Sequence, residues 1–143
     1  MKALLTTLLL TAALGAQAAE ADDEAFYRHA AGCVALLKQD ALALLPAAKG
    51  GDAPAKAQMV QLTAWGFGFI ASAYKRGLRN PRADTLLDEA EADQQNWPAS
   101  RRQEQGSRCL TDARDIFANA SGLERAIVNN RAAARVERLL NRK

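Results

Sequence analysis

The stretch from Gln58 to Leu78 reads QMVQLTAWGFGFIASAYKRGL, and it decides the expected fold. Its apolar residues recur at helical spacing on more than one side, which is typical of a helix surrounded by other helices. One stripe comprises Met59, Leu62, Gly66, Ile70 and Ala73, and the other comprises Val60, Ala64, Phe67, Ala71, Tyr74 and Leu78. We therefore expect this segment to be the central helix of an all-α bundle.

Small residues form a ridge along the same helix. Ala64, Gly68 and Ser72 are spaced by four, so they share one side and carry almost no side chain. A glycine inside a helix costs about 1 kcal/mol relative to alanine, and this segment contains two. Close approach of a neighbouring backbone along the ridge would compensate for that cost.

Length and composition agree with a small helical protein. The chain has 143 residues, of which 49% are hydrophobic but only 6% aromatic. Such a length fits one domain, and the composition lacks the β-branched and aromatic runs that strands need. The net charge of +3 is too small to predict nucleic-acid binding.

The N-terminus is predicted to be a signal peptide, residues 1–18. Lys2 supplies a positive start, an apolar run from Leu4 to Leu14 is too short to span a bilayer, and Ala16 and Ala18 fit a signal-peptidase site. We expect cleavage after Ala18, or alternatively after Ala19. The mature domain, residues 19–143, is then soluble, exported to the bacterial periplasm and without stable membrane insertion. Loss of Lys2 lowers its net charge to +2.

Two cysteines, Cys33 and Cys109, lie in this mature domain. In an oxidising compartment an isolated pair far apart in sequence predicts a disulfide bond. Closing such a loop stabilises a fold by about 4 kcal/mol in the chain-entropy model. The alternatives are two free buried thiols or half of a metal site.

Helix signals predict a bundle of four or five helices. The first should begin at Asp22 and end at Pro46, and the central helix should begin near Asp52 or Pro54 and stop around Gly77. Asn80 and Pro81 open a third helix that ends near Asn96. Capping boxes at Ser100 with Gln103 and at Ser121 with Glu124 open the fourth and fifth. The main apolar positions of the last helix are Leu123, Ile127, Val136, Leu139 and Leu140.

Two groups of basic residues are candidates for partner binding. One follows the central helix and comprises Lys75, Arg76, Arg79 and Arg82; the other lines one face of the last helix and comprises Arg131, Arg135, Arg138 and Arg142. Both groups have a structural explanation as charges that complement helix C-termini, and this explanation is preferred. Both also suit an acidic partner. For the last helix, a third explanation is pairing with an acidic stripe on the third helix, made of Asp84, Asp88 and Glu91.

Nothing in the sequence predicts catalysis, a metal or a cofactor. His29 is the single histidine, and the pattern nominates neither a nucleophile nor an orienting acid for it. His29 and Cys33 are four apart on a helix, but a metal site needs three or four ligands. There is no C-x-x-C-H motif, and Met59, the methionine that could join His29 on a haem, lies on an apolar stripe typical of core.

The expected function is therefore non-catalytic. We expect an exported accessory protein that recognises another protein, for example as an inhibitor or immunity protein. In general plan the chain is similar to small helical periplasmic proteins of bacteria, such as acid-stress chaperones and immunity proteins, and this similarity transfers no residue's role. The alternatives are a periplasmic chaperone and a carrier of a small apolar ligand, with its pocket between the first, second and fourth predicted helices.

Overall fold

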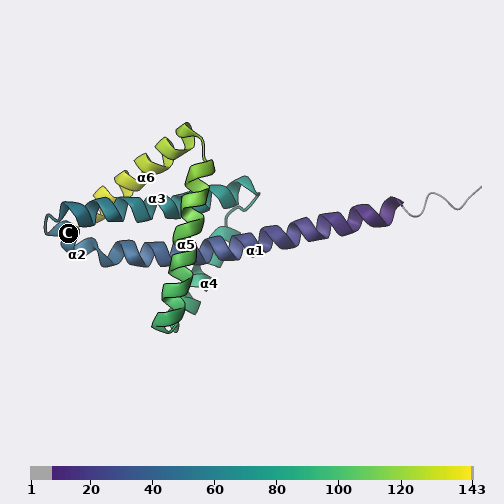
Figure 1. Cartoon of the computed structure of the whole chain (residues 1–143), viewed down its shortest axis with the longest axis horizontal. Helices are drawn as coiled ribbons and strands as arrows, with labels where there is room; N and C mark the ends of the chain where they lie inside the picture. Colours follow the sequence, from purple (N-terminus) through teal and green to yellow (C-terminus); the bar gives the residue numbers. More distant parts are fainter. Residues whose placement is uncertain (1–7, 143) are drawn as a thin grey trace, which may run out of the picture.

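The computed structural model describes the backbone of residues 8–142 and the side chains of residues 19–142. This part of the chain is all-α, as predicted (Figure 1). Six helices follow one another: α1 (Leu8–Ala43), α2 (Leu45–Lys49), α3 (Ala53–Lys75), α4 (Arg82–Gln94), α5 (Ala99–Asn119) and α6 (Gly122–Leu140). None of them contains an apolar stretch long enough to cross a membrane.

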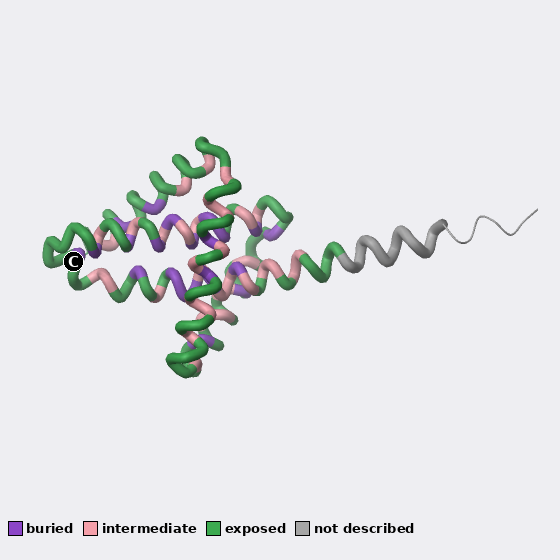
Figure 2. Tube along the Cα trace, in the orientation of Figure 1, coloured by how far each residue is buried: buried purple, intermediate pink, exposed green. Residues whose placement is uncertain are grey.

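The core forms where α5 crosses the pair made by α1 and α3. These two helices run side by side, and α5 lies across them at a steep angle (Figure 1). Buried residues gather near that crossing (Figure 2). The main cluster of buried residues comprises Ala30, Cys33, Leu36, Leu37, Ala41, Leu62, Phe69, Cys109 and Ala113. The stripe predicted for α3 thus lies partly in this core, together with apolar residues of its two neighbours.

The predicted disulfide between Cys33 and Cys109 is present and joins α1 to α5. Both cysteines are fully buried, and their Cα atoms are 5.3 Å apart. The covalent bond therefore lies inside the core and fixes the crossing of the two helices.

The glycines of α3 have different surroundings. A Cβ atom at Gly68 would lie 2.8 Å from Cε2 of Phe117, so this glycine makes room for a ring of α5. The expected close approach is real, but a side chain makes it rather than a backbone. Gly66 is also buried, yet a Cβ there would meet no atom within 4 Å.

The start of α1 differs from the prediction. The helix begins at Leu8 and not at Asp22, because the structure includes residues of the predicted signal peptide and no proline interrupts the alanine-rich sequence before Asp22. In Figure 1 the first half of α1 extends beyond the other helices. The predicted signal peptide falls on residues 1–7, which lie outside the described part, and on residues 8–18, of which only the helical backbone is described.

The short α2 is the helix that raises the number to six. Its last three residues lie between Pro46 and Asp52, where no helix was predicted. Pro46 was predicted to end the first helix, but it lies in the first turn of α2, where a missing N–H group is tolerated. The turn that follows contains Gly51 with φ of +93°, a conformation that favours glycine. Asp52 then caps α3, since its side chain accepts a hydrogen bond from the Ala55 N–H group at 3.0 Å.

Of the two predicted capping boxes, one is confirmed and one is wrong. Ser121 and Glu124 form both reciprocal hydrogen bonds at the start of α6. Ser100 caps nothing, because α5 begins one residue earlier, at Ala99, with Pro98 at the N-cap. Asn80 likewise does not cap α4; its Oδ1 accepts a hydrogen bond from the Tyr74 hydroxyl at 2.6 Å.

The packing of α6 also differs from the prediction. Leu123 and Ile127 were predicted as core positions, but they are 72% and 46% exposed. Ala132 and Val136 are fully buried instead, so the inward face is rotated away from Leu123 and Ile127. Leu123 and Ile127 each lie nine residues before a buried position, Ala132 and Val136, which places them about 180° around the helix on the side that faces away from α3. The second half of α6 contributes Val136 to a buried cluster with Met59.

Candidate functional site

The basic residues that follow α3 are engaged within the molecule. Lys75 forms an ion pair with Glu124, and Arg76 pairs with Asp23 at 3.3 Å while its guanidinium lies 4.0 Å from the ring centroid of Phe26. Arg79 donates hydrogen bonds to the carbonyl oxygens of Tyr74 and Leu78, and Arg82 pairs with Glu24. These contacts tie the end of α3 to α1 and α6, which supports the structural explanation of this cluster.

The pairing of Lys75 with Glu124 changes the acidity of the carboxyl group. The hydrogen bond from Lys75, together with the backbone N–H of Ser121, lowers the pKa of Glu124 from its ordinary value of 4.5 to about 2. The carboxylate also lies in the first turn of α6, where the helix dipole favours a negative charge. This site therefore holds α6 to α3 at neutral pH.

The second basic group has no such partners. Arg131, Arg135, Arg138 and Arg142 are all exposed, and we call them the arginine row. Between residues 19 and 142, every other lysine or arginine side chain forms an ion pair, donates a hydrogen bond or lies over an aromatic ring. Those contacts involve Arg28, Lys38, Lys49, Lys56, Lys75, Arg76, Arg79, Arg82, Arg101, Arg102, Arg108, Arg114 and Arg125. The side chains of the arginine row show no contact of these kinds in the described structure. The backbone carbonyl oxygen of Arg142, which lies two residues beyond the end of α6, accepts the hydrogen bond from Lys49.

The proposed internal pairing of the arginine row with α4 is not found. Glu91 pairs with Lys38 of α1 at 2.6 Å, and Asp84 and Asp88 form no ion pair within the described residues. Complementing the dipole of α6 accounts for Arg138, which lies in the last turn, but not for Arg131 or Arg135 farther back. The structure thus separates the two basic groups that the sequence presents as equivalent.

A groove runs beside the arginine row, between α1, α3 and α6. Its volume is about 350 Å³. Two of its side chains, Leu42 and Ile70, are exposed large hydrophobics, at 39% and 37% exposure. Leu62 and Gly66 of α3 and Arg135 and Arg138 of α6 also line it, and we call it the α6 groove. An apolar channel with two free arginines on one wall is suited to a partner that is both apolar and acidic.

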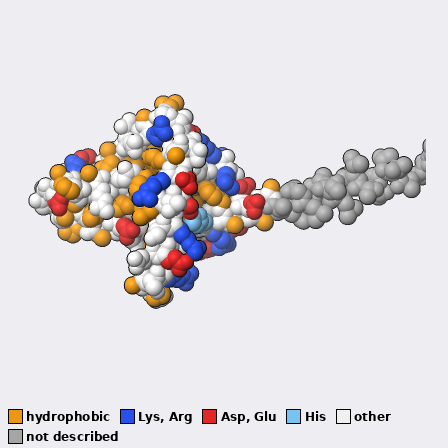
Figure 3. Space-filling model, in the orientation of Figure 1, with side chains coloured by type: hydrophobic (Ala, Val, Ile, Leu, Met, Phe, Trp, Pro, Cys, Tyr) orange, Lys and Arg blue, Asp and Glu red, His pale blue; other side chains and the backbone are white. Residues whose placement is uncertain are grey.

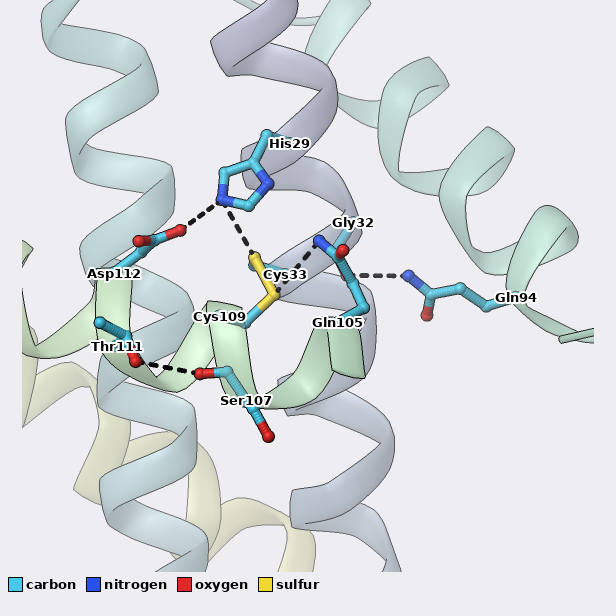
Figure 4. The surroundings of a disulfide bond; sticks show 9 residues. All are labelled: His29, Gly32, Cys33, Gln94, Gln105, Ser107, Cys109, Thr111 and Asp112. Atoms are coloured by element: carbon cyan, nitrogen blue, oxygen red, sulfur yellow. Dashed lines mark hydrogen bonds and ion pairs between the residues drawn. A yellow bond between two sulfur atoms is a disulfide. The ribbon is translucent and has the colours of Figure 1, made fainter. Parts of the chain in front are cut away.

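His29 of α1 contacts Asp112 of α5 beside the disulfide, a pair that the sequence analysis did not predict. His29 Nε2–H donates a hydrogen bond to Asp112 Oδ2 at 2.7 Å, and the same nitrogen lies 3.6 Å from Cys33 Sγ (Figure 4). The ring also packs edge-on against Phe69. Figure 3 shows this single histidine at the surface, with acidic and basic side chains around it. The pair supplies an orienting acid for His29. The other side chain that the imidazole nitrogen approaches is Cys33, whose sulfur is bonded to Cys109 and is not a free thiol.

A signal for this pair was available in the sequence. His29 precedes Cys33 by one helical turn, and Asp112 follows Cys109 by nearly one turn. Once the disulfide is assigned, both side chains are brought to the same crossing. Within the described residues, no group of three or more histidine, cysteine or acidic side chains could hold a metal ion.

Gln94 is a buried polar residue that the amphipathic pattern of α4 did not reveal. It is 1% exposed, and its Nε2 donates a hydrogen bond to the Gly32 carbonyl oxygen at 2.8 Å (Figure 4). Its own backbone carbonyl accepts a hydrogen bond from Arg102 at 2.9 Å. These bonds link α4 to α1 and α5, so we assign Gln94 a structural role.

Comparison of the chain with protein-family models, with curated proteins and with solved structures finds no match in any of the three.

Proposed function

We propose that the chain is an exported, non-catalytic protein that recognises another protein, and that the arginine row of α6 makes the contact. Recognition of this kind is what an inhibitor or immunity protein performs. The proposal treats the first basic group, which comprises Lys75, Arg76, Arg79 and Arg82, as structural.

The observation that carries the proposal is the contrast between the two basic groups. Thirteen described lysines and arginines have partners within the molecule. The side chains of Arg131, Arg135 and Arg138 on one face of α6, and of Arg142 just beyond its end, do not. Arginine is enriched at protein interfaces because its planar guanidinium binds carboxylates in a bidentate manner and stacks on aromatic rings. A row of free arginines beside an apolar groove combines both features of an interface.

Export is supported by the disulfide. Buried disulfides that staple a small domain form and persist in oxidising compartments such as the periplasm. The N-terminal pattern, with Lys2 followed by the apolar run Leu4–Leu14, supports the same localisation.

The competing proposal, a carrier for a small apolar ligand, receives less support. Its expected pocket lay between the helices now identified as α1, α3 and α5. Core side chains of all three helices, including Leu37, Phe69 and Ala113, pack together there.

The test is capture of a partner from periplasmic extract with a charge-reversed row. We expect the full chain to retain a partner at low salt, and the variant Arg131→Glu/Arg135→Glu/Arg138→Glu to lose it while keeping its helical circular dichroism. The matched control reverses three exposed arginines of α5, Arg101, Arg108 and Arg114, so its net charge changes equally. Equal capture by both variants, or no partner for the wild type, contradicts the proposal.

A further inference from the structure

Gly66 is a glycine that the fold itself does not require. It lies in the middle of α3, where glycine is unfavourable relative to alanine. Its φ is not positive, and a Cβ there would meet nothing within 4 Å, so neither backbone geometry nor packing excludes a side chain. Gly68, two residues later, has a steric reason to be glycine, because the Phe117 ring occupies the space where its side chain would be.

The free space beside Gly66 belongs to the α6 groove. Gly66 lines the groove together with Leu62 and Ile70 from the same helix, which lie about one turn before and after it. A side chain at this position would project into the groove and reduce its depth. The glycine therefore keeps open a space that no described residue of the chain fills.

We infer that the α6 groove binds a short amphipathic helix of the partner, with apolar side chains against Gly66 and carboxylates against Arg135 and Arg138. The inference rests on the proposed function, because it specifies what the arginine row recognises. It goes further by naming the secondary structure and the charge of the bound segment.

The backbone hydrogen-bonding needs of the bound segment restrict the secondary structure that it can adopt in the groove. The groove is lined by residues of helices, whose backbone N–H and C=O groups are already hydrogen-bonded within each helix. An extended peptide in this groove would find no main-chain partners for its own buried polar groups. A helix satisfies them internally, which is why apolar grooves between helices bind amphipathic helices.

The size of the groove limits the contact to about two helical turns. On α1 the lining extends from Val34 to Leu42, and on α3 from Leu62 to Ile70. Eight residues of α-helix span about 12 Å, so two turns of a bound helix would match both walls. The apolar residues of the occupant then follow an i, i+3/i+4, i+7 pattern.

The charge of the occupant follows from the groove's cations. Arg135 and Arg138 are one turn apart on α6 and have no partner in the described structure, whereas Lys38 on α1 is already paired with Glu91. Carboxylates at i, i+3 or i, i+4 on one flank of the bound helix would match the two free guanidinium groups. The opposite flank needs no particular charge.

A displayed library of 14-residue helical peptides, panned against the purified full chain, tests the inference. We expect enriched sequences to combine the i, i+4, i+7 apolar pattern with Asp or Glu on one flank. The enriched peptides should bind each of two variants of the chain, Gly66→Leu and Arg135→Glu/Arg138→Glu, at least about tenfold more weakly than they bind the wild-type chain. Gly106→Leu is the matched control, because Gly106 of α5 also has no atom within 4 Å of its Cβ position but does not line the groove.

Three outcomes overturn the inference: no enrichment over the starting library, enrichment of basic or proline-rich sequences, or unchanged binding to Gly66→Leu. Its failure is distinguishable from failure of the proposed function. If the captured partner is lost with the arginine-row reversal but retained by Gly66→Leu, protein recognition stands and the helix-in-groove inference falls. If capture is insensitive to the reversal, the proposed function itself falls.

Discussion

The ring of Phe117 on α5 occupies the space that a side chain at Gly68 of α3 would need, with 2.8 Å between Cε2 and the position of a Cβ. The two glycines of α3 therefore have different roles, although the sequence analysis explains both by close approach of a neighbouring helix. Gly68 permits packing inside the molecule, and Gly66 faces a groove.

Alanine at these two positions should change stability in opposite directions. Gly66→Ala should raise the free energy of unfolding by up to about 1 kcal/mol, because it adds helix propensity without a clash. Gly68→Ala should lower it by about 1–3 kcal/mol, because Phe117 must move. Urea denaturation of both variants checks this. Equal effects at the two positions would show that the α3–α5 packing is misassigned.

Removing the disulfide should weaken the fold strongly. The bond closes a loop with a sequence separation of 76 residues, and both sulfurs are buried. The double variant Cys33→Ala/Cys109→Ala should lose about 4 kcal/mol in the free energy of unfolding, since its unfolded chain is less constrained. Reduction of the wild type by dithiothreitol under unfolding conditions should give a similar loss. A loss below about 1 kcal/mol for the double variant would contradict a stabilising role.

Acid should remove the contribution of Glu124. Its pKa is lowered from 4.5 to about 2 in the folded chain, so its stabilisation is complete above the unfolded value and is lost as the pH falls from 4.5 toward 2. Glu124→Gln keeps a side chain able to complete the capping box but loses the charge. The melting temperature of wild type should exceed that of Glu124→Gln at pH 7. The difference should close below pH 4.5, and a constant difference would exclude this account.

The contact of His29 with Asp112 should couple the two residues energetically. Both side chains are partly exposed, at 34% and 45%, so the coupling should be modest, about 0.2–1 kcal/mol. A double-mutant cycle with His29→Gln and Asp112→Asn, followed by urea denaturation at neutral pH, measures it. Strictly additive effects of the two substitutions would mean that the hydrogen bond contributes nothing to stability.

Much of the fold follows from short-range pattern. The capping box at Ser121 and most of the first stripe of α3 are local signals, and the structure confirms them: Met59, Leu62 and Ala73 are buried, although Ile70 is exposed. Phe69, which is fully buried, belongs to neither predicted stripe. The disulfide follows from cysteine count and compartment. The contact of His29 with Asp112 was not predicted, although it follows when the predicted disulfide is combined with the helical spacing of these residues from Cys33 and Cys109.

The remaining features depend on which faces of the helices pack together and at what angle, and the hydrophobic pattern of a single helix does not specify either. The exposure of Leu123 results from which side of α6 packs on α3, and the sequence of α6 alone is equally compatible with a buried Leu123. Pairing of basic residues depends on the same geometry. Lys75 reaches Glu124 because α3 and α6 pack together, whereas Arg131 forms no ion pair with a described carboxylate.

Site-specific photo-crosslinking in the producing cell tests the central claim, that the arginine row of α6 contacts a partner, most directly. A benzophenone side chain would replace Ala134, which is exposed between Arg131 and Arg138, and in the control it would replace Ala118, which is exposed on α5. We predict a light-dependent adduct with another protein from position 134 and none from position 118. No adduct from position 134, or equal adducts from both positions, would contradict the account.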